Sequence, residues 1–263
     1  KGLIMSSLAK SKLFAIIALG IFLYGFVIPT VGFHGALEKI EQGKESTLSD
    51  TTYSLWNFYN KGRYFSNATP EEAKGDLKKM IDEAAELGVA STPLWSVSLE
   101  APNYPKEAFP QGIPVFFHFD GFSGEVHEMN TINHYIGMDP MERGGPYERV
   151  LAPYALVFTA FLMFLFILYD KKILSLFMLI PAALPVVFIG LYSYWLYWFG
   201  HNMHDYGAFK IKPFMPTVFG DGKVAQFVTH SYPTTGFWLL VAISLFSLLA
   251  ILSRSKALKA ENQ

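Results

Sequence analysis

Four apolar segments divide the chain and limit the architectures that it can adopt. They span 13–33, 150–169, 173–199 and 236–253, and none of them contains a charged residue. A helix of roughly 20 apolar residues is long enough to cross the ~30 Å hydrocarbon core of a bilayer. Hydrophobic residues make up 51% of the 263 residues, which suits a membrane protein with a large water-facing part.

We therefore predict an α-helical integral membrane protein with four transmembrane helices and a small α+β extracytoplasmic domain. We expect the first apolar segment to be a retained anchor rather than a cleaved signal peptide, because no small-x-small cleavage site is evident. The predicted division is 1–33 for the N-terminal tail and first helix, 34–149 for the extracytoplasmic domain, 150–200 for the second and third helices with a short cytoplasmic turn at 170–172, 201–235 for an extracytoplasmic loop, and 236–263 for the last helix and tail.

The distribution of charge predicts the orientation. The sections 1–12, 170–172 and 254–263 would share one side of the membrane, and together they carry eight basic and two acidic residues. The sections 34–149 and 201–235 carry 13 basic and 20 acidic residues. Because basic residues concentrate in cytoplasmic loops, both termini are expected in the cytoplasm of a bacterial inner membrane, with the main polar domain in the periplasm.

The polar segment 34–149 contains signals for both helices and strands. We predict an amphipathic helix near 69–88 and a further helix within 36–59. Alternation of apolar and polar residues over 94–99, and a short apolar run at 113–119, predict strands of a small β unit. In the later loop, Asp221-Gly222 flanked by apolar residues predicts a hairpin turn, and the hairpin could join the β unit.

Several classes of function are disfavoured by what the sequence lacks. There is no cysteine, which excludes thiolate metal sites, disulfides and covalent haem attachment through a Cys-x-x-Cys-His motif. No serine-hydrolase, P-loop or dinucleotide-binding motif occurs. The four apolar segments carry no charge of the kind that marks an ion pathway, so a transporter or pump is disfavoured. We expect contacts with the lipid bilayer and with protein partners, and none with nucleic acid.

The stretch 124–141 holds two histidines and three methionines directly before the second apolar segment. If this stretch is helical, His127 and His134 lie two turns apart, about 10 Å along the axis. That separation is too wide for one metal ion. His134 and Met138 are four residues apart and could share a ligand set, and we see no simple core-forming period in this stretch.

A second stretch of similar chemistry, 201–205, follows the third apolar segment. His201 and His204 have a spacing that would suit chelation on a helical turn, and Met203 adds a thioether. Topology brings the two stretches to the same membrane surface, so we predict that they form two halves of one site or interface. The candidate metal ligands are His127, His134, Met138, His201, Met203 and His204.

Imidazole and thioether ligands without thiolate suit copper, and Cu(I) especially, so copper is the predicted metal. Two other interpretations stay open at this point. The histidines and asparagines could satisfy backbone groups in a buried loop while the methionines fill gaps, or the stretch could be a docking surface for a partner. Haem is less favoured, because a bis-His haem in a helical bundle would need histidines within the apolar segments.

The stretches 94–105 and 124–138 resemble a poorly characterised family of bacterial membrane proteins. The resemblance lies in Ala-Pro-Asn-Tyr-Pro at 101–105 and in Gly-Glu-Val-His-Glu-Met-Asn-Thr-Ile-Asn-His-Tyr-Ile-Gly-Met at 124–138. The family looks like the accessory proteins encoded with nitrous oxide reductase and its copper-handling and electron-transfer partners. The resemblance implies a link to copper or to periplasmic respiration, and it attaches no mechanism to these residues.

The leading expectation is a non-enzymatic accessory protein or subunit of a periplasmic respiratory metalloenzyme system, linked to copper through binding or delivery. The alternative is a structural or electron-transfer subunit of a larger membrane oxidoreductase complex, with 124–141 as the protein interface. A membrane copper enzyme is a third and weaker possibility.

Overall fold

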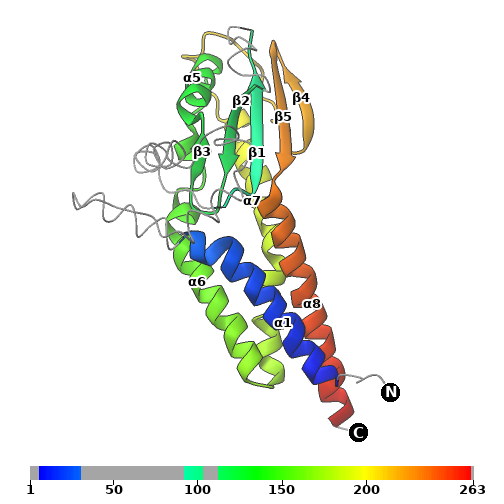
Figure 1. Ribbon diagram of the computed structural model, residues 1–263. Helices are drawn as coiled ribbons and strands as arrows, with labels where there is room; N and C mark the ends of the chain where they lie inside the picture. The colour runs from blue at the N-terminus through cyan, green and yellow to red at the C-terminus, as the bar shows by residue number, and fades with distance from the viewer. Residues whose placement is uncertain (1–5, 31–91, 103–111, 262–263) are drawn as a thin grey trace, which may run out of the picture.

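The computed structural model describes residues 6–30, 92–102 and 112–261. Four long helices form a bundle, and a small antiparallel sheet with one short helix sits on one end of it (Figure 1). The start of the first helix and the end of the last helix both lie at the opposite end of the bundle (Figure 1). The helices predicted within 36–59 and 69–88 fall outside the described residues.

The described residues of the four predicted apolar segments are mainly helical. The helices are α1 (Ser7–Phe22), α6 (Pro146–Leu168), α7 (Leu179–His201) and α8 (Thr235–Glu261). A π-helical stretch, Leu23–Val27, continues α1, and a short 3-10 turn, Lys172–Leu176, precedes α7. By length and composition, the helical stretches 7–30, 146–168, 172–201 and 235–260 could each cross a membrane. This confirms the helical part of the predicted fold class. The helices α1, α6 and α8 begin before their apolar segments, and α7 and α8 end after theirs.

Within the bundle, α1 packs mainly against α8 and also against α6, while α7 packs mainly against α8. Small residues allow the close approach of α1, since Ala15 and Ala18 are fully buried. The hydroxyl of Ser11 donates a hydrogen bond of 2.9 Å to the carbonyl oxygen of Ala250 in α8. The consecutive helices α6 and α7 therefore find their main packing partners elsewhere in the bundle.

A buried cation lies near the end of the bundle that is remote from the sheet. Arg254 in α8 is fully buried, and its guanidinium carbon lies 3.6 Å from the centroid of the Phe166 ring. The same side chain donates a 2.7 Å hydrogen bond to the carbonyl oxygen of Tyr169 and lies 3.4 Å from the Asp170 carboxylate. Lys12 reaches the other oxygen of Asp170 at 3.0 Å. The short turn at 170–172 thus joins α1 and α8 through charge, which the apolar pattern alone did not reveal.

The sheet has five strands in the order β3-β2-β1-β5-β4, and every neighbouring pair is antiparallel. Its strands are β1 (Trp95–Glu100), β2 (Ile113–Phe117), β3 (Phe122–Gly124), β4 (Gly220–Val224) and β5 (Phe227–Pro233). The strands predicted over 94–99 and 113–119 are confirmed. Because β1 pairs with β5, the two polar segments of the chain share one sheet.

The hairpin of the later polar segment forms, but the predicted turn is wrong. Asp221 and Gly222 lie inside β4, and the turn is Ala225-Gln226, between the paired residues Val224 and Phe227. Gly222 serves close packing rather than a turn, since a Cβ atom there would lie 1.7 Å from the side-chain oxygen of Thr217. The unusual backbone of the turn falls on Ala225, whose φ is +53°.

The stretch after β3 forms helix α5 (Val126–Ile136), which packs on the sheet. Contrary to the sequence analysis, this stretch does have a core-forming period. Its buried residues recur at helical spacing and face β1, β2 and β5 in one apolar cluster. The buried positions of the helix are Val126, Met129, Ile132, Asn133 and Ile136. Polar residues between these positions made the helical period difficult to recognise in the sequence.

A buried polar node joins the sheet to the bundle. The indole N–H of Trp95 in β1 donates a 2.8 Å hydrogen bond to Ser231 Oγ in β5. Tyr192 Oη in α7 lies 3.1 Å from the same oxygen, and Ser231 itself donates to the carbonyl oxygen of Val218. Since β5 also runs almost directly into α8, the sheet is attached to the bundle by chain continuity and by this node (Figure 1).

Candidate functional site

The two predicted stretches meet at the C-terminal end of α5. Gly137 ends this helix in a left-handed conformation with φ of +82°, which favours glycine. The backbone N–H of His204 donates a 2.7 Å hydrogen bond to the carbonyl oxygen of Gly137, and that of Phe209 donates to Tyr135 at 3.1 Å. A Cβ atom on Gly137 would lie 2.4 Å from the carbonyl oxygen of His204. The helix end and the loop are therefore in direct backbone contact.

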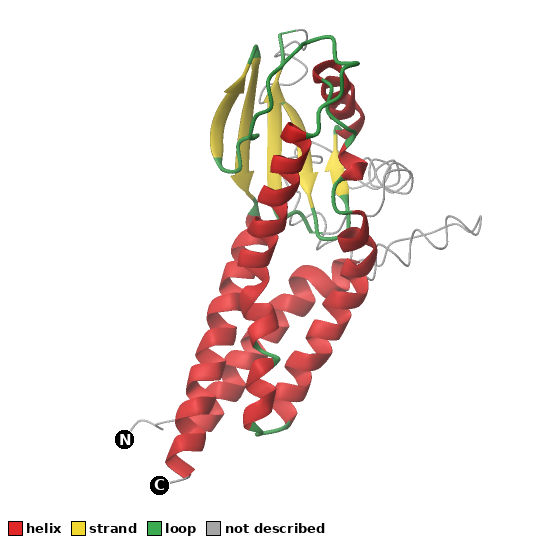
Figure 2. Ribbon diagram, turned by 180° about the vertical axis from the view of Figure 1, so that it is seen from behind, coloured by secondary structure: helices red, strands yellow, loops and turns green. Residues whose placement is uncertain are grey.

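Figure 2 shows how the chain reaches this position: the loop that follows α7 runs past α5 before it enters the sheet at β4. The predicted association of 124–141 with 201–205 is therefore present in the fold. What the association does chemically depends on which side chains it brings together.

An aromatic ring connects the two halves. His134 stacks on Tyr206, with ring centroids 4.8 Å apart and planes inclined by 19°. His204 also stacks on Tyr206, at 5.1 Å and 13°. Nε2 of His204 lies 3.2 Å from Oδ1 of Asp139, a contact that becomes an ion pair when the imidazole is protonated. Two imidazoles from distant segments thus share one tyrosine ring.

His201 makes different contacts. It is the last residue of α7, its Nδ1–H donates a 2.9 Å hydrogen bond to the carbonyl oxygen of Tyr197, and its ring stacks on that of Tyr197 at 3.9 Å. The chain leaves the helix at Asn202, so His201 and His204 do not stand on one helical turn as the spacing predicted. The helix ends one turn too early for that geometry.

The remaining predicted ligands are also dispersed. Met138 follows the left-handed residue at the end of α5 and is only 8% exposed within the apolar cluster, whereas His134 is exposed. Met203 packs against the same cluster, so both thioethers are held by apolar contacts. His127 is exposed at the start of α5, about 10 Å along the axis from His134.

The positions of the six predicted ligands decide whether they could share one metal ion. Among residues 6–30, 92–102 and 112–261, no three His, Asp or Glu side chains are grouped so that they could hold a metal ion. The six predicted ligands do not fit one preassembled site. The nearest approach to a ligand set is His134 and His204 around Tyr206, with Asp139 beside His204. Copper binding stays a prediction.

The surface around Tyr206 has a clear composition. We call it the His-Tyr face, formed by His134, Tyr135, His204, Tyr206 and Phe209. Tyr135, Tyr206 and Phe209 are 52%, 50% and 44% exposed, which is high for large apolar side chains. The sequence analysis missed the aromatic members Tyr206 and Phe209, whereas Tyr135 lies within the stretch 124–141 that it proposed as a site or interface. The signal available was their position beside the two histidine-containing stretches.

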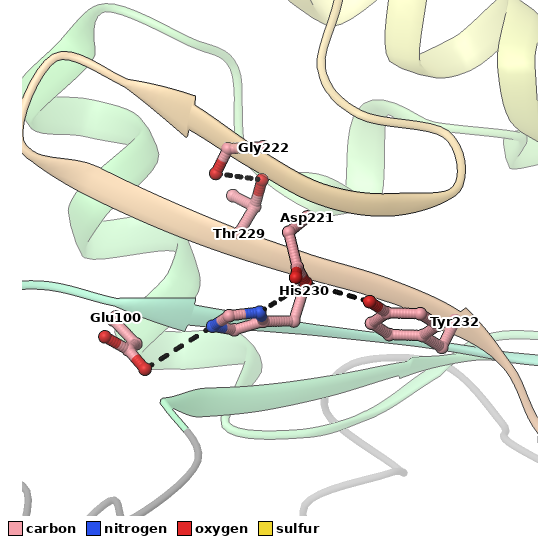
Figure 3. Close-up of polar contacts among 6 residues, drawn as sticks. All are labelled: Glu100, Asp221, Gly222, Thr229, His230 and Tyr232. Atoms are coloured by element: carbon pink, nitrogen blue, oxygen red, sulfur yellow. Dashed lines mark hydrogen bonds and ion pairs between the residues drawn. The ribbon is translucent and has the colours of Figure 1, made fainter.

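A second polar cluster (Figure 3) lies on the face of the sheet opposite to the one that packs on α5. Nδ1 of His230 in β5 lies 2.7 Å from Oδ1 of Asp221 in β4, and its Nε2 lies 3.4 Å from Oε1 of Glu100 in β1. Tyr232 donates a 2.9 Å hydrogen bond to the same oxygen of Asp221. The cluster links three adjacent strands. Sequence analysis did not single it out, because strand register alone brings these residues together.

The geometry of this cluster shifts its titration. The hydrogen bond to Asp221, with a further one to Glu100, raises the pKa of His230 above its ordinary value. The bonds from His230 and Tyr232 lower the pKa of Asp221. The hydrogen bond that Tyr232 donates to Asp221 raises the pKa of the Tyr232 phenol. The cluster is thus most strongly bound when His230 is a cation and Asp221 an anion.

Comparison of this chain with family models, with curated proteins and with solved structures found no match.

Proposed function

We propose that this protein is a membrane-anchored accessory protein or subunit of a respiratory metalloenzyme system, and that the His-Tyr face is where it contacts its partner. The four candidate spans hold the protein in a bacterial inner membrane. Both termini are cytoplasmic, and the sheet domain is in the periplasm. The role is non-enzymatic. The observation that carries the proposal is the exposed aromatic and histidine surface built where α5 meets the loop after α7.

The composition of the face supports contact with a protein. Tyrosine and phenylalanine are enriched at protein interfaces, because they bury a large area and lose little side-chain entropy. Here Tyr135, Tyr206 and Phe209 are each at least 44% exposed. They lie on the end of α5 and on the loop after α7, two segments that backbone hydrogen bonds hold together. A surface of this kind is preorganised, which reduces the entropic cost of binding.

The attachment of the face to the bundle supports a role at the membrane. Loop 202–209 begins at the end of α7, and α5 leads through a short connection to α6. Each half of the face is therefore tied to a different candidate span. A partner held on this face would be kept at the membrane surface. The resemblance at 94–105 and 124–138 supports a copper-dependent respiratory partner of the kind that nitrous oxide reductase represents.

A second candidate function, binding of copper by the face itself, is favoured by one observation. His134 and His204 both stack on Tyr206, so the fold brings two imidazoles from distant segments of the chain to one side chain. Imidazole is a suitable copper ligand. With only two imidazoles and the Asp139 carboxylate at hand, such a site would suit transfer to a partner better than permanent storage.

The interface is tested by substitution on the face. Purification in mild detergent from its native membrane should retain a partner that the Tyr206→Ala variant loses. His127→Ala, on the exposed first turn of α5, is the control and should retain it. Retention of the partner by Tyr206→Ala would contradict the proposed interface.

Copper binding is tested separately by reconstitution with Cu(I) and metal analysis of the purified protein. The wild type should bind copper, and the double variant His134→Ala/His204→Ala should lose it, while His201→Ala should not. Equal copper content in all these proteins, or none in the wild type, would remove the second candidate function and leave the interface proposal standing.

A further inference from the structure

An apolar cavity of about 430 Å³ lies where the sheet meets the bundle. Its walls come from the face of the sheet that carries Val97, Leu99 and Phe117, from the buried side of α5, from the first turns of α6, and from most of the length of α7. Figure 2 shows the end of α7 lying against that face of the sheet. The size falls within the range of small-molecule binding sites.

The cavity is elongated along α7. Its lining on this helix begins at Leu184 and ends at Phe199, and fifteen residues of α-helix correspond to about 22 Å. One end therefore reaches well into a candidate span, and the other reaches the sheet domain at Phe227 in β5. A long and apolar space suits a hydrocarbon chain better than a compact polar molecule.

The cavity is continuous with the outer surface of the spans. Leu151 in α6, and Val187 and Leu191 in α7, line the cavity and are still 60%, 50% and 41% exposed. All three lie within candidate spans, and α6 and α7 take their main packing partners from α1 and α8 rather than from each other. With the spans in a bilayer, this side of the cavity faces lipid.

Polar groups line the end of the cavity near the start of α6. Glu148 accepts a 3.3 Å hydrogen bond from the indole N–H of Trp195. Arg149 donates to the carbonyl oxygens of Gly144 and Glu142, and its guanidinium carbon lies 5.2 Å from the centroid of the Phe122 ring. A guanidinium has five N–H groups, so its capacity to bind an oxygen acceptor exceeds these two bonds.

We propose that this cavity binds the long apolar chain of a molecule drawn from the bilayer, with an oxygen-bearing head placed near Arg149. The molecule enters sideways between α6 and α7, and its chain extends under the sheet. A phospholipid and a neutral isoprenoid share this chemistry. The inference does not depend on the His-Tyr face or on copper.

Photolabelling tests this directly. The protein is reconstituted into vesicles of phosphatidylethanolamine and phosphatidylglycerol that carry either a diazirine-bearing phosphatidylglycerol or a diazirine-bearing polyprenol. After illumination, labelled residues are located by mass spectrometry. We expect labels on Met129 and Met138, which line the cavity from the sheet domain and are less than 9% exposed. Lipid that merely surrounds the spans cannot reach these residues.

The chain offers a matched pair of control variants. Val186 and Val187 are neighbours on α7, are 76% and 50% exposed, and only Val187 lines the cavity. Val187→Trp should abolish labelling of Met129 and Met138, and Val186→Trp should leave it unchanged. Ala155→Trp, at an exposed lining position on α6, should act like Val187→Trp. Equal thermal unfolding temperatures would show that all three variants are folded.

The labelling results distinguish a phospholipid from an isoprenoid, and they also show when the proposal is wrong. Labelling of the two methionines by the phosphatidylglycerol probe identifies a phospholipid chain, and labelling by the polyprenol probe identifies an isoprenoid. Labels confined to outward-facing positions such as Val186 with both probes would overturn the proposal. Labelling of Met129 that persists in Val187→Trp and Ala155→Trp would overturn it as well.

Discussion

The backbone N–H of His204 donates a 2.7 Å hydrogen bond to the carbonyl oxygen of Gly137, although the two residues are separated by 66 others in the sequence. This bond joins the end of α5 to the loop after α7, where the rings of His134 and His204 both stack on Tyr206. The geometry leaves no room for a side chain at residue 137, because a Cβ atom would approach the carbonyl oxygen of His204 to 2.4 Å. The candidate site therefore depends on one glycine.

Gly137→Ala should separate the two halves of the His-Tyr face. Left-handed backbone costs a non-glycine residue about 1–2 kcal/mol, and the steric conflict with His204 adds to it. We expect lower thermal stability in detergent, together with faster hydrogen exchange at His204 and Phe209. Gly190→Ala in α7, where a Cβ atom would meet no atom within 4 Å, is the control. Unchanged exchange at His204 in Gly137→Ala would contradict this account.

Ser231→Ala should weaken the attachment of the sheet to the bundle. The change removes the acceptor of Trp95 Nε1–H, the partner of Tyr192 Oη and the donor to Val218. A buried polar group left without a partner costs about 1–3 kcal/mol, so the free energy of unfolding should fall by at least that amount. Denaturant unfolding measures it.

Ser96→Ala is the control for this substitution. Ser96 is in the same sheet, and its hydroxyl makes one exposed hydrogen bond of 3.3 Å to the carbonyl oxygen of Tyr232. We expect only a small change there. A similar loss in both variants would mean that the node makes no special contribution.

The cluster around His230 predicts a pH dependence of stability with a definite sign. The pKa of His230 is raised above 6.5, so the stability that its protonated form contributes is complete below pH 6.5 and is lost as pH rises through the raised value. The pKa of Asp221 is lowered below 3.8, so its contribution is complete above pH 3.8 and is lost as pH falls through the lowered value. The cluster is most stabilising between these two limits.

His230→Gln should remove this dependence. The unfolding temperature of the wild type should exceed that of the variant by more at about pH 6 than at about pH 9. His127→Gln, exposed on α5, supplies the comparison for loss of a histidine outside the cluster. An equal difference between wild type and His230→Gln at both pH values would contradict the assignment.

The charged residues at the remote end of the bundle should contribute unequally. Arg254 is fully buried, and Asp170 is its acidic partner. Removing one partner of a buried ion pair lowers the free energy of unfolding by up to about 3–5 kcal/mol. Lys12 and Asp170 pair with 35% and 39% of their side chains exposed, where about 0–1 kcal/mol is usual. Asp170→Ala should therefore destabilise the protein clearly more than Lys12→Ala. The reverse order in denaturant unfolding would contradict this.

The large features of the fold could be predicted because each rests on a strong local pattern. Charge-free segments of 18 residues or more predict long apolar helices, and the alternation of Trp95, Val97 and Leu99 with polar residues predicts one buried face of a strand. The hairpin was expected, but its turn was placed at Asp221-Gly222. A glycine required by close packing against Thr217 carries the same local signal as a glycine required by a turn.

The candidate site was predicted in outline and not in detail. The association of 124–141 with 201–205 followed from topology, but the ligand set did not, because spacing along the chain says nothing about where a helix ends. Gly137 ends α5 before Met138, and Asn202 ends α7 before His204, so neither predicted pair stands on a common helical turn. The burial of Met138 and the stacking on Tyr206 depend on tertiary packing.

The most direct test of the proposed role is crosslinking from the His-Tyr face in the native membrane. A photo-activated benzoylphenylalanine replaces Tyr135, which is 52% exposed, and in a control it replaces Tyr232, which is 41% exposed in β5 among the residues on the other side of the sheet. The account predicts a discrete adduct with one extracytoplasmic metalloprotein from position 135 and none from position 232. No adduct from position 135, or the same adduct from both positions, would contradict it.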